Sequence, residues 1–207
     1  MKPRQPAQGQ GAKSGGGVSQ DEGAWKTKRS AARRGVFSSL HTERKRIMTF
    51  GISTSCFYPE LTEKAAEWLA AARIPAAEVF FNAPSELAPA FLRKLRDTLD
   101  AGGTRVVSVH PFTSGLEPLL FFSEYRRRFE DGVEMYRRFF EAAAFLGASY
   151  VVLHGDRKEG KLPREEYFAR YRALDEAARE HGVRLVQENV GRCRGGSAEF
   201  LAAMPEA

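Results

Sequence analysis

Three short apolar segments of the chain each end in a side chain that can bind a metal ion. The segments are Val106–His110, Tyr150–His154 and Arg184–Glu188. In a parallel β/α barrel the C-terminal ends of the strands meet at one rim, so we expect these terminal side chains to converge on one site. Two imidazoles and one carboxylate suit a divalent ion such as Zn²⁺ or Mn²⁺.

Each of the three residues also has a purely structural interpretation. Glu188 could cap the loop that follows it or pair with Arg192. A single histidine at a strand end is more often hydrogen-bonded than metal-bound. The equivalent placement of His110 and His154 on consecutive strands favours a role in a pocket for both, and leaves direct metal ligation open.

From Met48 onward, segments typical of strands alternate with segments typical of helices. We expect strands at 49–55, 77–81, 105–110, 150–154 and 183–189, and helices at 62–73, 85–102, 123–146, 164–180 and from 197. Single helices between strands favour right-handed crossovers and a parallel sheet. The continuous apolar character of the strands agrees, because parallel strands are covered on both faces. No GxGxxG motif follows the first strand, so a Rossmann dinucleotide site has no support.

Positive charge is concentrated before Met48. Residues 1–47 contain 11 Lys and Arg against 3 Asp and Glu, whereas the remaining residues contain 21 against 23. The first part is also rich in Gly, Ser and Gln, which predicts a disordered basic N-terminal extension followed by a domain over 48–207. A DNA-binding face is expected to be basic, so the near-neutral composition of the domain argues against a nucleic-acid partner.

No apolar stretch approaches the length of a membrane span, and no signal-peptide core is visible. We therefore expect a cytoplasmic protein without membrane contact. The two cysteines, Cys56 and Cys193, lack CxxC spacing, which agrees with a reducing compartment. Cys56 follows the first expected strand, and we expect it to be a small buried apolar residue rather than a nucleophile.

Five segments in order carry a family resemblance. They are FGISTSCFYP at 50–59, AEVFFN at 77–82, VSVHPF at 107–112, LHGD at 153–156 and QENVGR at 187–192. This ordered set resembles the sugar phosphate isomerase/epimerase family of the xylose isomerase-like TIM barrel superfamily, which also includes apurinic endonucleases of the endonuclease IV type. The resemblance implies an α/β fold: a partial TIM (β/α)8-type barrel of about five βα units, with parallel strands and outer helices.

The resemblance also implies a divalent metal cofactor, Mn, Zn, Co or Mg, at the C-terminal rim of the barrel. It places the family's carboxylate ligand on Glu188, which is then also the candidate catalytic acid or base. His110 and His154 match ligand positions of the endonuclease branch. In the sugar-acting branch the same positions more often contact substrate or line the pocket.

Three further residues are candidates for the pocket. Asn189 follows the proposed carboxylate ligand directly. Asp156 could orient His154 or contact substrate, and could equally stabilise its own turn. Glu78 lies inside the second strand, where an unpaired carboxylate is costly, so it needs a polar barrel interior or a partner. A structural ion pair and a substrate contact are equally compatible with its position.

The function that these expectations favour is a metal-dependent sugar or sugar-phosphate isomerase or epimerase, which transfers a proton beside a carbonyl. Its partner is a small sugar, and a homo-oligomer is compatible with this interpretation. The alternative is an endonuclease IV-like phosphodiesterase that acts at abasic sites in DNA.

The number of strands departs from the family pattern. A closed barrel needs eight strands and about 250 residues, and the family's remaining ligands, an Asp, a His and a second Glu, come from strands six to eight. Five strands up to Ala207 therefore predict a truncated chain. Such a chain lacks part of the family's site, and a third hypothesis is that the chain by itself is not a working enzyme.

Overall fold

The computed structural model describes residues 48–204. The disorder predicted for residues 1–47 lies outside the described residues. Among the described helices, none combines the length and the apolar character that a membrane span requires.

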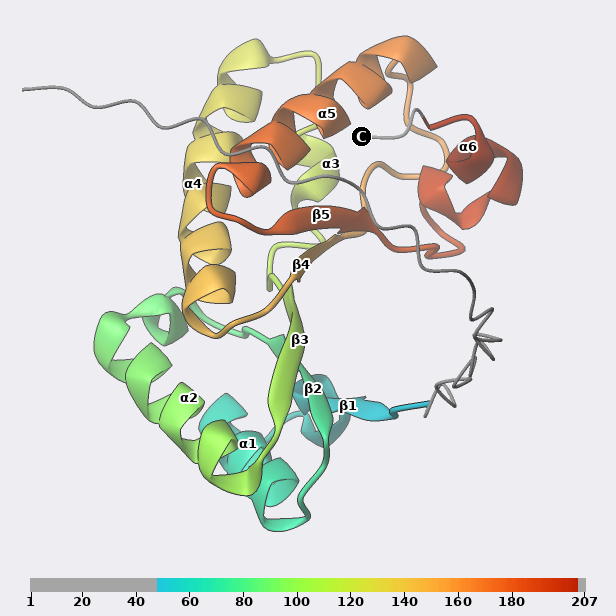
Figure 1. The fold of residues 1–207 in the computed structure, drawn as a ribbon. Helices are drawn as coiled ribbons and strands as arrows, with labels where there is room; N and C mark the ends of the chain where they lie inside the picture. Colours follow the sequence, from blue (N-terminus) through green and yellow to red (C-terminus); the bar gives the residue numbers. More distant parts are fainter. Residues whose placement is uncertain (1–47, 205–207) are drawn as a thin grey trace, which may run out of the picture. The chain divides into compact units, whose positions relative to one another are not determined.

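The described residues form one parallel sheet of five strands in sequence order (Figure 1). The strands are β1 (Gly51–Ser53), β2 (Ala76–Phe80), β3 (Arg105–His110), β4 (Tyr150–Leu153) and β5 (Arg184–Gln187). Every neighbouring pair is parallel, and one register irregularity occurs between Ala77 and Glu78. The predicted parallel α/β architecture is therefore confirmed.

Helices or short helical turns connect the strands. They are η1 (Thr54–Phe57), α1 (Thr62–Ala71), η2 (Pro84–Leu87), α2 (Pro89–Gly102), α3 (Glu117–Leu120), α4 (Arg126–Phe145), α5 (Arg164–Arg179), η3 (Arg194–Gly196) and α6 (Ala198–Ala202). Helix α2 ends at Gly102, as expected for the helix at 85–102. Gly103 caps it with a φ of 72°, a left-handed conformation that glycine adopts without steric cost.

Most of the core lies between the helices and one face of the sheet. Helix α1 packs on β2, α2 on β3, α4 on β3 and β4, and α5 on β5 (Figure 1). The fully buried aromatic rings of Tyr136, Phe139 and Phe140 come from α4 and join the core cluster that includes Val109 and Val151. Burying a side chain of this size stabilises the fold by roughly 1.5–3 kcal/mol.

The other side of the sheet bears a hollow of about 440 Å³. Its lining comes from β1, β2 and β3 and the residues beside them, and includes Ser53, Glu78 and Ser108. In a closed barrel this face is the interior, which side chains from all strands fill. The five described strands form an open part of such a barrel.

The expected elements agree with the observed ones to within a few residues, apart from the segment after β3. The strand expected at 105–110 has those bounds in the structure. The segment between 110 and 123, for which no helix was expected, contains the short helix α3. The long helix expected from residue 123 begins at Arg126. A helix of four residues is too short for a helical periodicity to be visible in the sequence.

Candidate metal centre

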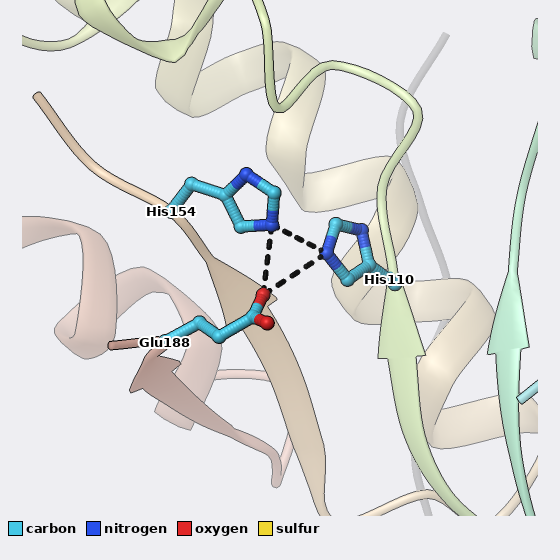
Figure 2. A group of neighbouring side chains, drawn as sticks. All are labelled: His110, His154 and Glu188. Atoms are coloured by element: carbon cyan, nitrogen blue, oxygen red, sulfur yellow. Dashed lines mark hydrogen bonds and ion pairs between the residues drawn. The ribbon is translucent and has the colours of Figure 1, made fainter. Parts of the chain in front are cut away.

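The three strand-end residues lie together at one edge of the sheet. His110 is the last residue of β3, His154 follows β4 directly, and Glu188 follows β5 directly. Since β3, β4 and β5 are adjacent and parallel, their C-terminal ends deliver the three side chains to one point (Figure 2). One ligand atom from each residue lies within 4.8 Å of the other two.

One carboxylate oxygen faces both imidazoles. Glu188 Oε2 lies 2.7 Å from His154 Nε2 and 3.5 Å from His110 Nε2, and the two Nε2 atoms are 2.9 Å apart. The side chains of His110 and His154 are 7% and 12% exposed, whereas Glu188 is 46% exposed. The imidazoles therefore form the floor of the site, and the carboxylate lies at its opening.

The ring of His110 is held in the orientation that a ligand needs. Its Nδ1 lies 3.0 Å from the carbonyl oxygen of Pro111, so Nδ1 carries the proton and donates it to that oxygen. Nε2 then presents its lone pair to the site. The ring also stacks on Phe80 at 4.5 Å between centroids. A hydrogen bond from the second ring nitrogen is the usual support of a metal-binding histidine.

His154 is kept neutral by its surroundings. Burial lowers the pKa of the His154 imidazole below its usual value, and the charge of His110 lowers it further, partly opposed by Glu188. A neutral imidazole is the form that binds a metal. Its Nδ1 is buried and has no hydrogen-bond partner among the described residues.

The donor set fits a divalent ion. Two imidazole nitrogens bound to a tetrahedral Zn²⁺ at about 2.0–2.1 Å lie roughly 3.3 Å apart. The observed separation of 2.9 Å would need to widen by only roughly 0.4 Å. The three residues supply two nitrogens and one oxygen, a set that suits Zn²⁺ or Mn²⁺.

Gln187 fixes the strand ends behind the site. Its Nε2 donates to the carbonyl oxygens of Leu153, His154 and Glu188 at 3.2, 2.8 and 3.1 Å. Its Oε1 accepts a hydrogen bond of 2.6 Å from the hydroxyl of Tyr167. One amide thereby ties the ends of β4 and β5 together.

A buried carboxyl supports the same region from α3. Glu117 is fully buried, and its Oε2 accepts a hydrogen bond of 2.7 Å from the Gly155 N–H. Its Oε1 accepts one of 2.9 Å from the Tyr136 hydroxyl, which also bonds Thr113. Burial raises the pKa of Glu117 to about 8, although both hydrogen bonds favour the charged form.

Sequence reasoning missed the roles of Gln187 and Glu117. Gln187 belongs to the QENVGR motif, which is a usable signal, whereas Glu117 lies between the expected strand at 105–110 and the expected helix at 123–146, where no motif marks it. Gly155, between these supports, has a φ of 81°, and a Cβ there would lie 2.1 Å from the Tyr167 hydroxyl. Only glycine fits this position.

The other predicted pocket residues do not contact the three donors. Asp156 Oδ1 accepts a hydrogen bond of 2.8 Å from the Arg157 N–H, so it stabilises its own turn, and no hydrogen bond joins it to His154 within residues 48–204. Asn189 is exposed. Glu78 accepts a hydrogen bond of 3.1 Å from Ser108. This hydroxyl is a partner for the partly buried carboxylate.

The expectation for Cys56 was wrong. Cys56 is exposed in η1, whereas Cys193 is buried. The strand β1 ends at Ser53, three residues before the cysteine, so Cys56 belongs to a surface turn and not to the packed sheet.

Comparisons with known proteins place the chain in a family. The model of the xylose isomerase-like TIM barrel matches residues 65–206. No match was found among proteins of curated function.

Solved structures show the same fold. A D-tagatose 3-epimerase-like protein aligns with a TM-score of 0.63 and 23% identity over 77% of this chain and 60% of its own. A D-allulose 3-epimerase from Methylomonas sp., solved with D-allulose, has a TM-score of 0.57 and 18% identity over 75% and 58%. An AP endonuclease, family 2, from Brucella melitensis has a TM-score of 0.56 and 15% identity over 77% and 66%.

The chain thus spans about three fifths of the length of the two epimerase structures. The five parallel strands with their outer helices correspond to that part of the barrel. The match of the family model covers more than half of the chain. The chain therefore belongs to the xylose isomerase-like TIM barrel family.

Proposed function

We propose that this chain contributes the metal-binding half of a sugar or sugar-phosphate isomerase or epimerase. The observation that carries the proposal is the convergence of His110, His154 and Glu188 on one point at the C-terminal rim of the sheet (Figure 2). That rim is where barrels of this class perform their chemistry. Two structural neighbours, the D-tagatose 3-epimerase-like protein and the D-allulose 3-epimerase, support the choice of reaction.

In this proposal the three side chains hold a divalent ion through His110 Nε2, His154 Nε2 and Glu188 Oε2. When bound, such an ion supplies Lewis-acid polarisation of a substrate carbonyl. The buried imidazoles exclude water from one side of the site, and the half-exposed carboxylate borders the substrate side. Gln187 keeps the backbone of His154 and Glu188 in register.

Glu188 is our candidate for moving the proton. Its Oε1 has no hydrogen-bond partner among the described residues, so this oxygen is available to a substrate. When it accepts a proton from the carbon beside the carbonyl, the C–H electron pair forms a carbon–carbon double bond and the carbonyl oxygen becomes negative. Return of the proton to the former carbonyl carbon, together with transfer of the hydroxyl proton of the deprotonated carbon to the former carbonyl oxygen, gives the isomer. Return to the opposite face of the deprotonated carbon gives the epimer and requires a second proton donor.

Proton exchange with solvent tests this proposal. The full chain is incubated in heavy water with Mn²⁺ and with D-tagatose, D-fructose or D-allulose, and deuterium incorporation beside the carbonyl is followed by proton NMR. We expect exchange that disappears in excess chelator and in Glu188→Gln, and that persists in Glu159→Gln, an exposed loop carboxylate. Exchange that continues at full rate in excess chelator would overturn the metal-dependent reaction. Tight metal binding without deuterium exchange would overturn the proposal that this chain is active by itself.

A second function is favoured by the nitrogen-rich donor set. Two imidazoles suit Zn²⁺, and one structural neighbour is an AP endonuclease, family 2. The charge of the domain argues against this second function. Residues 48–207 have two more acidic than basic side chains, whereas the phosphate backbone of DNA binds to basic protein surfaces. Incision of a duplex with one abasic site, sensitive to chelator and to His110→Ala, would reverse our ranking.

A further inference from the structure

A second hollow lies on the outer side of the rim, between the β4–α5 loop and α6. It has a volume of about 280 Å³ and is lined by Lys158, Arg164, Arg194, Ser197, Glu199 and Phe200. Three of these side chains are cationic and one is acidic. We call this site the basic hollow. None of its residues belongs to the candidate metal centre.

The two walls of the basic hollow are joined by backbone contacts. The Lys158 N–H donates to the carbonyl oxygen of Arg192 at 3.0 Å, and an antiparallel bridge connects Arg157 with Cys193. These two segments are the loops that follow His154 and Glu188, so the hollow and the candidate metal centre share the same two loops.

Arg194 is rigidly placed in the hollow. Its side chain is only 14% exposed, and its Nη1 donates to the Leu162 carbonyl oxygen at 2.6 Å. The guanidinium lies 5.3 Å from the ring centroid of Tyr167 and 4.9 Å from that of Phe200. The nearest carboxylate, Asp156, is 3.9 Å away and makes no hydrogen bond to it. A fixed, incompletely paired guanidinium is well suited to bind an anion.

The other two cations are also available. Lys158 is exposed, and Arg164 has a 3.9 Å contact with its exposed neighbour Glu165. The Ser197 hydroxyl accepts a hydrogen bond from the Phe200 N–H, so its own proton is free to donate. Three cations against Glu199 in the lining and Asp156 beside Arg194 leave an excess of one positive charge, which favours an anion.

We infer that the basic hollow binds the phosphate of a small phosphomonoester. One part of this inference rests on the proposed function: that the phosphomonoester is the sugar substrate itself. If so, the preferred substrate class is a sugar phosphate. The binding of phosphate itself rests on the charges and contacts of the hollow and needs no metal.

The test is a titration of the full chain with inorganic phosphate in excess chelator, followed by calorimetry. We expect saturable binding that weakens about tenfold or more in the double variant Lys158→Gln, Arg164→Gln, because two charge-assisted contacts are lost. The matched control is Lys161→Gln with Arg172→Gln. Both are exposed cations on the same loop and helix but outside the lining, and the control should bind phosphate as the wild type does. Thermal melts show whether each variant is folded.

Competition distinguishes the ligand classes. A hexose monophosphate should displace inorganic phosphate, and the unphosphorylated hexose should not. Absence of saturable phosphate binding in the millimolar range, or equal binding by the double variant and the wild type, would overturn the inference. Stronger competition by a single-stranded oligonucleotide would overturn the assignment to a small monoester. Chelator is present throughout, so the titration measures phosphate binding without a metal ion. Absence of phosphate binding would therefore not count against metal binding, and absence of metal binding would not count against phosphate binding.

Discussion

Replacing the buried carboxyl of Glu117 by an amide should change how the stability of the protein depends on pH. Burial raises the pKa of this carboxyl from the ordinary 4.5 to about 8. The folded protein therefore holds a proton on Glu117 in a range where the unfolded chain has released it. Stability from this group is complete below pH 4.5 and is lost as the pH rises toward 8. Glu117→Gln keeps the shape of the side chain and removes the titration.

The size of the effect follows from the single proton involved. Between the two pKa values each pH unit costs the wild type about 1.4 kcal/mol of unfolding free energy. From pH 5.5 to pH 7.5 the stability of Glu117→Gln should therefore rise relative to wild type by about 3 kcal/mol. The amide can still accept from the Gly155 N–H and donate to the Tyr136 hydroxyl, so the hydrogen-bond partners seen in the structure are retained.

The assay is urea denaturation of the full chain at pH 5.5, 6.5 and 7.5 in the presence of chelator, followed by circular dichroism. His154, whose pKa is lowered by burial, gives the opposite slope, because the unfolded chain takes up its proton first as the pH falls. It is present in both proteins, so the difference between them isolates Glu117. The exposed Glu159→Gln serves as control and should follow the wild type. Parallel stability profiles for wild type and Glu117→Gln would refute the reasoning.

Three further predictions concern the metal centre and its surroundings. Removing one of three donors in His154→Ala should weaken Co²⁺ binding by about 100-fold or more, measured by the absorption of the bound ion; unchanged affinity would exclude His154 as a ligand. Gly155→Ala places a Cβ 2.1 Å from the Tyr167 hydroxyl at a φ of 81°, and should lower the unfolding free energy by about 2–4 kcal/mol in urea. Cys56 is exposed, whereas Cys193 is buried with its thiol pKa raised by burial, so a thiol reagent should label one cysteine rapidly; two fast thiols would contradict this burial.

Much of the fold follows from local patterns in the sequence. The strand ending at His110 has the predicted bounds, because a continuous apolar run between a glycine pair and a polar loop is typical of a parallel strand. The placement of His110, His154 and Glu188 at strand ends is a property of the sequence. Parallel strands in sequential order then necessarily bring their ends to one edge.

What supports the candidate centre depends on contacts between residues far apart in the chain. Glu117 became a buried support only because α3 packs beside the turn at Gly155, 38 residues later. Its pKa is set by that burial and not by its neighbours in sequence. In the same way, the basic hollow exists because the loop at Lys158 pairs with the segment at Arg192.

The sequence by itself determined the order of the strands, the helices between them and the three residues presented at the rim. These properties depend on residue type and short-range spacing, which a sequence states directly. The tertiary structure alone decided that the Glu188 carboxylate faces both imidazoles through one oxygen. It likewise decided that the Asp156 carboxylate accepts a hydrogen bond from the Arg157 N–H and that Cys56 lies at the surface. Such outcomes are set by packing between distant segments, because distance and burial fix which polar groups meet and which charges are stable.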